Sequence, residues 1–369
     1  MKAKMICAAT LLALLAGTNV PNPARATETL YLYTWADFFP EQVINDFTKE
    51  TGIEVKQAFY DTVEMPETKL MTGNTGFDLV LTAGFTTPRL IQAGVLKEID
   101  HTKLANITNI DPGFVKRQLR LTDPEMRYAI PLDWGLTTIV YNAEKVRQVL
   151  GPDAPVDSLA LLFDPANAAK LQSCGISMLD SPFDDMSLGM LYVGMKDIYH
   201  ATEEDIKRGA EALKAVRPYV RYYDNTRYPQ DLASGDICAA IGWNNDAVRA
   251  DQVAADAGHQ LDIKVMLPKE GLVGWSDRLV IPKDAAHPDA ALAFINFLLQ
   301  GKSAAAFTMD TLIATPNIKA ADYLDPKLRN NPGIFPPADH VDSVHPDFTY
   351  GPLQDREITR AFTKVKTGT

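Results

Sequence analysis

Short apolar runs alternate along the chain with segments whose apolar residues recur every three or four positions. The runs predict strands at residues 28–35, 53–59 and 77–81, because four to eight apolar residues bounded by turn residues are typical of buried strands. The intervening patterns predict helices at 40–52, 66–73 and 87–94. This alternation favours an α/β layer fold with a mostly parallel sheet.

One apolar run, at residues 235–241, carries the clearest sign of a binding site. It is short and apolar enough for a buried strand, and it leads into Gly242, Trp243, two asparagines and Asp246. Open α/β sheets present their ligands at the carboxyl ends of strands. We therefore expect this aromatic ring and this carboxylate to face a ligand.

All four tryptophans lie within three residues of an aspartate. The other three pairs are Trp35 with Asp37, Trp275 with Asp277, and Trp134 with Asp133. An aromatic face attracts an ammonium group by about 0.5–2 kcal/mol, and a carboxylate binds it by charge-assisted hydrogen bonds of roughly 1.5–3 kcal/mol. The alternative is that tryptophan fills the core and aspartate begins turns, which explains one pair better than four. The pattern favours a cationic amine with an apolar body.

Two extended stretches, at residues 129–142 and 265–277, indicate that the chain crosses from one lobe to a second and returns. Two lobes joined by such crossings form a cleft that can close on a ligand. Between the crossings we expect a helix that begins at Thr202 with an acidic first turn. After them we expect an apolar helix from Pro288 to a stop at Gly301, a loop-rich tail, and a final amphipathic helix at about 355–365. The predicted division is a signal peptide at 1–26, lobe 1 at 27–136 and 264–310, lobe 2 at 137–263, and a C-terminal segment at 311–369 that packs mainly on lobe 2.

The N-terminus has the features of a secretory signal. Lys2 and Lys4 precede an apolar run at residues 5–17 that is too short to span a bilayer, and a small-x-small site ends at Ala26. We expect a mature, exported chain that begins at Thr27 and resides in the periplasm. Loss of the signal changes the formal net charge from −11 to −14. Such acidity argues against a nucleic-acid partner, which requires a basic footprint.

Two cysteines, Cys174 and Cys238, remain after the signal. An even pair in an exported protein predicts one disulfide, and two buried free thiols are the alternative. No metal or cofactor site is expected. His340 and His345 with Asp347 are the nearest approach to a metal cluster, and an ordinary polar loop explains them better. The sequence also has no nucleophile elbow and no phosphate-binding loop.

Motifs along the whole mature chain resemble the polyamine-binding proteins of bacterial ABC importers, which are type II periplasmic binding proteins. The matching stretches are 32–37, 47–53, 73–80, 235–243, 331–337 and 363–366. The resemblance is greatest to the putrescine-binding members. It implies a two-lobed fold that binds a linear diamine or polyamine in the cleft and delivers it to a membrane permease.

The resemblance also implies roles for single residues. Three aromatic residues would enclose the alkyl chain, namely Trp35, Trp243 and Trp275. Four carboxylates would hold the amines: Asp246 and Asp277 at one ammonium, Asp37 near the other end, and Asp184 at the second amine. Asp185 is adjacent, so the last assignment is open between the two. Cys174 and Cys238 match the disulfide positions of the family.

Four positions depart from the family pattern, and each loses a hydroxyl: Ala36, Phe38, Phe85 and Ile313. Each lost hydrogen-bond partner can cost about 1–3 kcal/mol. The ligand could therefore be a longer polyamine, a monoamine, or an ω-amino acid such as γ-aminobutyrate or 5-aminovalerate. An ω-amino acid requires a cation for its carboxylate, and Arg89 and Arg278 are the candidates, although each is more typical of a solvated surface arginine.

The prediction is a monomeric solute-binding protein, not an enzyme, that captures putrescine or spermidine and delivers it to an inner-membrane ABC permease. Three alternatives stay open: the same scaffold with specificity for an ω-amino acid, a binding protein that serves a sensor, and a secreted hydrolase. Binding without turnover would exclude the last.

Overall fold

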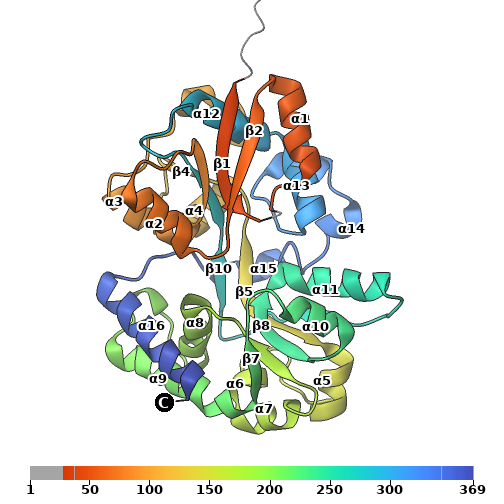
Figure 1. Cartoon of the computed structure of the whole chain (residues 1–369). Helices are drawn as coiled ribbons and strands as arrows, with labels where there is room; N and C mark the ends of the chain where they lie inside the picture. The colour runs from red at the N-terminus through yellow and green to blue at the C-terminus, as the bar shows by residue number, and fades with distance from the viewer. Residues whose placement is uncertain (1–27, 37, 342, 369) are drawn as a thin grey trace, which may run out of the picture.

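The computed structural model describes residues 28–36, 38–341 and 343–368. Within these residues the chain forms two sheets, one of five strands and one of seven, each flanked by helices. Figure 1 shows them as two lobes, one above the other, joined by extended chain. The predicted signal peptide lies outside the described residues.

Lobe 1 is built on the smaller sheet, whose strand order is β2-β1-β3-β11-β4. Its strands are β1 (Thr29–Trp35), β2 (Glu54–Tyr60), β3 (Leu79–Ala83), β4 (Ala129–Pro131) and β11 (Asp277–Val280). Its helices are α1 (Glu41–Thr51), α2 (Glu64–Thr72), α3 (Thr87–Gln92), α4 (Pro112–Gln118), α12 (Pro288–Leu298), α13 (Gly301–Thr311) and α14 (Pro326–Arg329).

Lobe 2 is built on the larger sheet, in the order β12-β10-β5-β8-β6-β7 with β9 paired to β5. Its strands are β5 (Gly135–Asn142), β6 (Ile176–Met178), β7 (Val220–Tyr223), β8 (Ala239–Trp243), β9 (Ile263–Val265), β10 (Leu272–Trp275) and β12 (Val344–His345). Its helices are α5 (Ala143–Leu150), α6 (Ala160–Phe163), α7 (Pro165–Leu171), α8 (Pro182–Tyr192), α9 (Glu203–Val216), α10 (Tyr228–Ser234), α11 (Asn244–Asp256) and α16 (Pro352–Thr367), while α15 (Ala338–Val341) lies between the lobes.

Both sheets are mixed, so the expectation of a mostly parallel sheet was wrong. In lobe 1, β1 pairs in parallel with β2 and β3, but β11 is antiparallel to β3 and β4. In lobe 2, β5 is antiparallel to β8, β9 and β10. The antiparallel pairs involve β5, β10 and β11, which border the crossings between lobes. A strand that enters a sheet from the other lobe does not follow the right-handed crossover that makes parallel neighbours.

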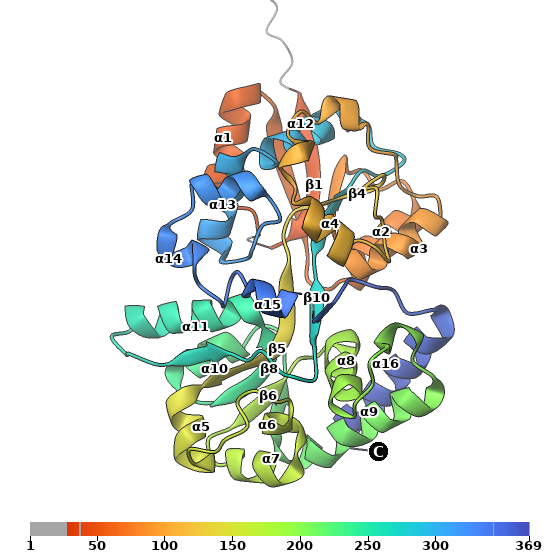
Figure 2. The same cartoon turned by 180° about the vertical axis from the view of Figure 1, so that it is seen from behind.

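The chain crosses between the lobes where the sequence indicated, but within very few residues. The first crossing lies between β4 and β5, and the second is Ser276 alone, between β10 and β11. Figure 2 shows β5 and β10 side by side between the lobes, and the two strands pair there. β9 and β10 belong to the larger sheet, and Ala314 and Asn317 bridge to Trp134 and Ile110. The assignment of residues 264–310 to lobe 1, and of residues 311–369 to a segment that packs mainly on lobe 2, stays a prediction.

Each lobe has its own apolar core. The lobe 2 core surrounds β5, β6 and β8, and the main lobe 1 core lies between the smaller sheet and α1, α12 and α13.

Helix α9 begins with the expected cap, since Thr202 and Asp205 exchange hydrogen bonds at its N-terminus. Helix α13, which follows the expected stop at Gly301, was not predicted. Its Ala304 and Ala305 pack against Ala320 and Leu324, while Phe307 lies in the lobe 1 core.

The predicted disulfide is present. Cys174 and Cys238 are joined at 2.00 Å between their sulfur atoms, with Cα atoms 5.5 Å apart. The bond links the turn after α7 to the residue before β8.

In the described part of the chain, no single helix has the length and apolarity to cross a membrane; only the pair α12 and α13, bent by 77°, meets those two criteria together. Most residues of this pair are buried in the lobe 1 core.

Candidate ligand cleft

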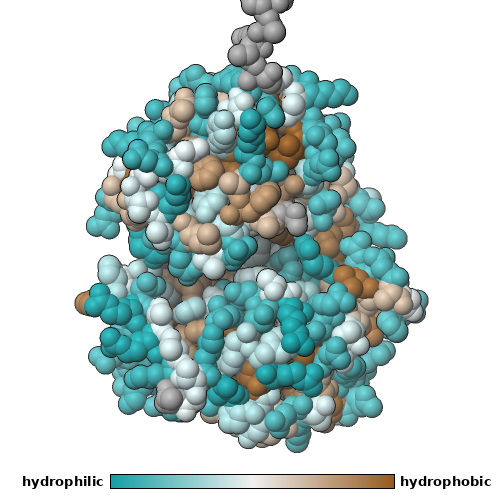
Figure 3. All heavy atoms as spheres, in the orientation of Figure 1, coloured by the Kyte–Doolittle hydropathy of each residue, from teal (hydrophilic) through white to brown (hydrophobic). Residues whose placement is uncertain are grey.

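The carboxyl ends of three strands bring three of the four tryptophans to the junction of the lobes. Trp35 ends β1, Trp243 ends β8 and Trp275 ends β10. The middle strand β5 holds two of them in register, because it pairs Gly135 with Trp275 and Thr137 with Trp243. The rings of Trp243 and Trp275 meet edge to face with centroids 6.5 Å apart. Figure 3 shows an indentation of the surface between the lobes.

The fourth tryptophan does not join this group. The Trp134 ring lies 5.8 Å from the ring of Phe114, and its backbone bridges to Ala314. It fills a small apolar cluster beside the crossing. For Trp134 the alternative explanation applies, namely that the tryptophan fills apolar space and does not face a ligand.

Glycine at position 135 makes room for the indole of Trp275. A Cβ atom there would lie 2.2 Å from Cζ2 of Trp275 and 2.8 Å from Oδ1 of Asn244. Real side chains do not approach so closely, so any larger residue would displace the ring. The position of the Trp275 indole therefore depends on glycine at position 135, a residue that was not among the predicted site residues.

Two buried carboxylates of lobe 2 lie beside Trp243. Asp184, in the first turn of α8, accepts hydrogen bonds from Thr137 Oγ1 at 2.5 Å and from Ser181 Oγ at 2.7 Å. Asp246, in the first turn of α11, accepts one from the hydroxyl of Tyr228. Each aspartate is 8% exposed. Thr137 pairs with Trp243 across the sheet, and the Tyr228 hydroxyl that bonds to Asp246 also bonds to the backbone of Trp243, so both carboxylates lie near the end of β8.

Tyr228 connects this carboxylate to the strand end. Its hydroxyl donates to Asp246 and accepts from the backbone N–H of Trp243 at 2.9 Å. The ring lies against Gly242, where a Cβ atom would come within 2.5 Å of it. Sequence reasoning missed Tyr228, because it lies 15 residues before Trp243 on another element.

Burial raises the pKa of both lobe 2 carboxyls. For Asp184 the hydrogen bonds from Thr137 and Ser181 offset part of the rise in pKa. For Asp246 the Tyr228 hydroxyl and the nearby Arg249 do so. Removal from water disfavours the charged form, and a donor or a cation favours it. An ammonium group between the two would stabilise both charges.

The neighbouring Asp185 has different surroundings. It is fully buried, and the electrostatic neighbours of its carboxyl are Asp184, Asp180 and Lys366, the last on α16 behind the helix. Burial raises its pKa well above the ordinary value, and the charge of Asp184 adds to this. Asp184 is bonded to β5 and Asp185 is not, which favours Asp184 as the residue that faces a ligand.

Lobe 1 contributes a second pair of carboxyls. Asp277 begins β11, and its backbone N–H donates to Oδ1 of Asp133 at 3.0 Å. Tyr60, at the end of β2, adjoins both this pair and Trp35. The centroid of its ring lies 4.4 Å from that of the indole. Its pKa is raised by burial and then by the charges of Asp277, Tyr33 and Asp133. Asp133 and Tyr60 were not among the predicted site residues, although the sequence paired Asp133 with Trp134.

Burial and then the charge of Asp347 raise the pKa of Asp277 to about 7, against a lowering by Arg278. Burial and then the charge of Asp277 raise the pKa of Asp133 well above its ordinary value. Carboxyls with such surroundings favour a cation as their partner.

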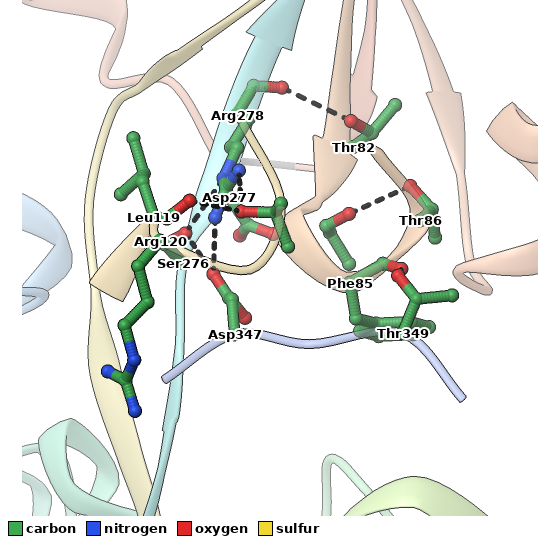
Figure 4. A network of polar contacts seen from close by, with 12 residues as sticks. Thr82, Phe85, Thr86, Leu119, Arg120, Ser276, Asp277, Arg278, Asp347 and Thr349 are labelled. Carbon is green, nitrogen blue, oxygen red and sulfur yellow. Dashed lines mark hydrogen bonds and ion pairs between the residues drawn. The ribbon is translucent and has the colours of Figure 1, made fainter. Parts of the chain in front are cut away.

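Arg278 is not the surface arginine that its sequence suggested. It is fully buried and pairs with Asp347 at 3.0 Å, while its other nitrogens donate to Ser276 Oγ and Thr122 Oγ1. Figure 4 shows Asp347, on the segment before α16, directed toward this guanidinium. The neighbours of Arg278 along β11, Asp277 and Leu279, gave no sign of this partner, which lies 69 residues away. Arg89, the other arginine considered, forms two hydrogen bonds to Glu67, at 2.6 and 2.7 Å.

The four positions that lack family hydroxyls do not share one environment. Phe38 packs on the rings of Phe39 and Phe307, Ile313 is buried in the lobe 1 core, and Ala36 is exposed at the turn after β1. Asp37 lies outside the described residues. Phe85 lies between the lobes, where its ring stacks on Phe183 of α8 with centroids 4.8 Å apart.

Other features lie apart from this cleft. A surface hollow of about 540 Å³ between α3 and α16 is lined by Arg89, Tyr350, Pro352, Asp355, Arg356, Thr359 and Arg360, and by none of the tryptophans. Across residues 28–36, 38–341 and 343–368 no group of three histidine, cysteine or acidic residues has the arrangement of a metal site. His345 instead bonds to the hydroxyl of Tyr199 at 2.8 Å.

Comparison with known proteins agrees with this architecture. A putrescine-binding periplasmic protein of Escherichia coli is 38% identical over 355 residues, which cover 96% of this chain and 95% of the relative. One of Pseudomonas aeruginosa is 36% identical over 97% of this chain and 98% of its own length. Among solved structures, the substrate-binding protein of a spermidine/putrescine ABC transporter from Streptococcus pneumoniae has a TM-score of 0.77 at 21% identity, over 92% of this chain and 99% of its own.

These findings confirm the predicted two-lobed α/β fold and the family resemblance. The family model described as bacterial extracellular solute-binding protein matches residues 42–336, which is most of the chain. The chain therefore belongs to the bacterial extracellular solute-binding proteins.

Proposed function

We propose that this protein captures a polyamine, putrescine first and spermidine second, in the cleft between its lobes and delivers it to an inner-membrane ABC permease. Several relatives are named as putrescine-binding periplasmic proteins, and they match this chain over nearly its whole length. The predicted N-terminal signal supports export to the periplasm. We propose further that the protein acts as a monomer, without a cofactor and without catalysis.

The observation that carries the proposal is a set of carboxyls from both lobes near the paired tryptophans, buried in lobe 2 and partly buried at Asp277. Asp184 and Asp246 come from lobe 2, and Asp277 comes from lobe 1. A buried carboxylate is costly unless a cation accompanies it. A linear diamine supplies a cation at each end and methylenes between them, which the indole faces of Trp243 and Trp275 can cover.

The proposed ligand-binding residues therefore keep the predicted set. They are Trp35, Ala36, Asp37, Phe38, Phe85, Asp184, Trp243, Asp246, Trp275, Asp277 and Ile313. The geometry supports the tryptophans and Asp184, Asp246 and Asp277 most directly. Phe38 and Ile313 would act through the apolar wall behind the ligand, because both contact the lobe 1 core.

Cleft closure is the proposed mechanism. In this structure, residues of the two lobes touch outside the tryptophan group: Phe85 stacks on Phe183, and Arg249 of α11 donates to the carbonyl of Thr311 at 3.1 Å. A ligand that binds carboxyls of both lobes has a higher affinity for this closed arrangement than for one with the lobes apart. That difference in affinity shifts the population toward closure.

An ω-amino acid has less support as the ligand. Its carboxylate would need a cation, and both arginines considered from the sequence already have carboxylate partners, Glu67 for Arg89 and Asp347 for Arg278. The carboxyls that remain in the cleft would repel the ligand's own. We therefore keep the amine as the proposed ligand class.

Calorimetry of the mature, ligand-stripped protein tests this function. Putrescine, spermidine, γ-aminobutyrate and 5-aminovalerate are titrated in turn. We expect one-to-one binding of putrescine, with spermidine weaker and both amino acids silent. Heat from an ω-amino acid with silence from both polyamines would overturn the proposed ligand, and turnover of the titrant would overturn the binding-protein assignment.

A further inference from the structure

Asp133 has an unusual position for a carboxyl group. It lies in the crossing between β4 and β5 and is fully buried. Its Oδ1 accepts the backbone N–H of Asp277, but its Oδ2 has no hydrogen-bond partner among the described residues. A buried carboxylate oxygen without a donor is costly when charged. Either a proton or a cation from outside is therefore needed at this oxygen.

Among the residues that the structure describes, the groups around Asp133 and Asp277 do not supply that cation. Asp277 comes from β11, and Tyr60 of β2 lies near the pair with its hydroxyl donating to the carbonyl of Leu81 at 2.8 Å. Asp347 faces it from the segment before α16. The cation that acts on Asp277 is its neighbour Arg278, whose guanidinium is already held by Asp347, Ser276 and Thr122.

The charges are thus out of balance. Arg278 and Asp347 neutralise one another, which leaves the fully buried carboxyl of Asp133 and the partly buried carboxyl of Asp277 without a second cation among the described residues. Two carboxyls in one site cannot both ionise cheaply, so one keeps its proton near neutral pH.

We propose that Asp133 and Asp277 form a carboxyl pair that holds one shared proton and exchanges it for the ammonium group of the bound amine. The inference rests on the proposed amine ligand and adds Asp133 to the residues that bind it. The exchange is balanced: the ammonium enters with one positive charge, and one proton leaves the pair for solvent. Capture by lobe 1 is then coupled to pH.

The surroundings of the pair agree with this exchange. Burial raises the pKa of Asp277 to about 7 and the pKa of Asp133 well above its ordinary value, which favours a proton on the pair near neutral pH. An incoming cation lowers both pKa values. Amine affinity should therefore rise as the pH increases from about 6 to about 8.

The test is calorimetry of putrescine binding to the wild-type protein at pH 7, in phosphate and in Tris. These buffers differ strongly in ionisation enthalpy, so the difference in heat gives the number of protons released. We expect about half a proton or more per putrescine, because a group at its pKa is half protonated. Release of no proton would overturn the exchange.

A variant locates the proton. Asp133→Asn keeps the shape of the side chain and removes its charge, so proton release should fall to about zero and putrescine affinity at pH 8 should fall by roughly tenfold. Asp185→Asn, at an equally buried carboxyl behind α8, is the matched control and should retain both. Full proton release from Asp133→Asn would overturn the role of Asp133.

A measurement without ligand separates this inference from the proposed function. A carboxyl whose pKa is raised in the folded state stabilises the protein below the unfolded pKa of about 3.9, and this stability is lost as the pH rises through the folded pKa. The wild-type unfolding free energy should therefore fall between pH 5 and pH 8, and less so in Asp133→Asn. Equal slopes would overturn the shared proton. Unequal slopes without putrescine binding would support the shared proton and overturn the proposed ligand instead.

Discussion

At the level of single residues, the candidate site depends on side chains that hold the ligand-facing groups in place. Tyr228 is the clearest case, because one hydroxyl bonds to both Asp246 and the backbone of Trp243. Asp246 and Trp243 were predictable, since they follow a short apolar run. Tyr228 was not, because its contact with them depends on how α10 packs against the end of β8.

Asp246→Asn tests the lobe 2 carboxylate. Asparagine keeps an oxygen for the Tyr228 hydroxyl but loses the charge, so putrescine affinity should fall by at least about 1.5 kcal/mol, roughly tenfold. Calorimetry measures the change, and thermal unfolding checks that the variant is folded. Unchanged affinity in a folded variant would remove Asp246 from the site.

Gly242→Ala tests the close approach of Tyr228 to β8. The new Cβ would lie 2.5 Å from Cε2 of the ring, so the ring must move and its hydroxyl with it. Overpacking of this kind typically costs about 1–3 kcal/mol. We expect a lower unfolding temperature and weaker putrescine binding, measured by calorimetry. An unfolding temperature equal to that of wild type would mean that the ring accommodates the methyl group.

At the level of elements, α8 shows how a helix decides between two adjacent aspartates. Ser181 caps the helix, and its first turn places Asp184 toward Thr137 on β5. The next residue is turned by about 100° along a helix of 3.6 residues per turn, so Asp185 is directed elsewhere. The sequence identified the acidic pair but not its orientation, which depends on the packing of α8 against β5 and α16.

The disulfide tests how far one cross-link stabilises lobe 2. Its cysteines are 64 residues apart, and loop closure over that length corresponds to about 4 kcal/mol in the chain-entropy model. The double variant Cys174→Ala/Cys238→Ala should lose about that much unfolding free energy in denaturant titrations. Putrescine affinity at 25 °C should change little, since neither cysteine is near the tryptophans. A loss below about 1 kcal/mol would contradict the estimate.

At the level of the whole molecule, the two lobes are joined by contacts that the sequence pattern did not predict. Arg278 and Asp347 form a buried ion pair between β11 and the segment that leads to α16, and Phe85 stacks on Phe183 across the cleft. In each pair the partners are more than 60 residues apart. The contacts that join the lobes therefore depend on residues whose neighbours along the chain do not indicate their role.

Phe85→Ala tests the stacking between lobes. An aromatic pair of this kind contributes about 0.5–1.5 kcal/mol beyond area burial, so putrescine affinity should fall by about two- to tenfold. Small-angle scattering with putrescine should show a larger fraction of open molecules than in wild type. Phe59→Ala is the matched control, because Phe59 is 51% exposed on the edge strand β2. Equal effects of the two variants would contradict a specific role for Phe85.

The sequence by itself determined the fold class, the disulfide partners and the strand ends that carry Trp35, Trp243 and Trp275. These follow from local pattern: apolar runs form strands, strand ends present side chains, and motifs repeat those of a known family. Only the tertiary structure decided that Trp134 packs against a small apolar cluster away from the cleft, that Asp184 and not Asp185 bonds to β5, that Arg278 is buried with Asp347, and that Asp133 adjoins Asp277. Each of these depends on contacts between residues far apart in the chain. Those contacts decide which side chains are removed from water and which charges lie close together.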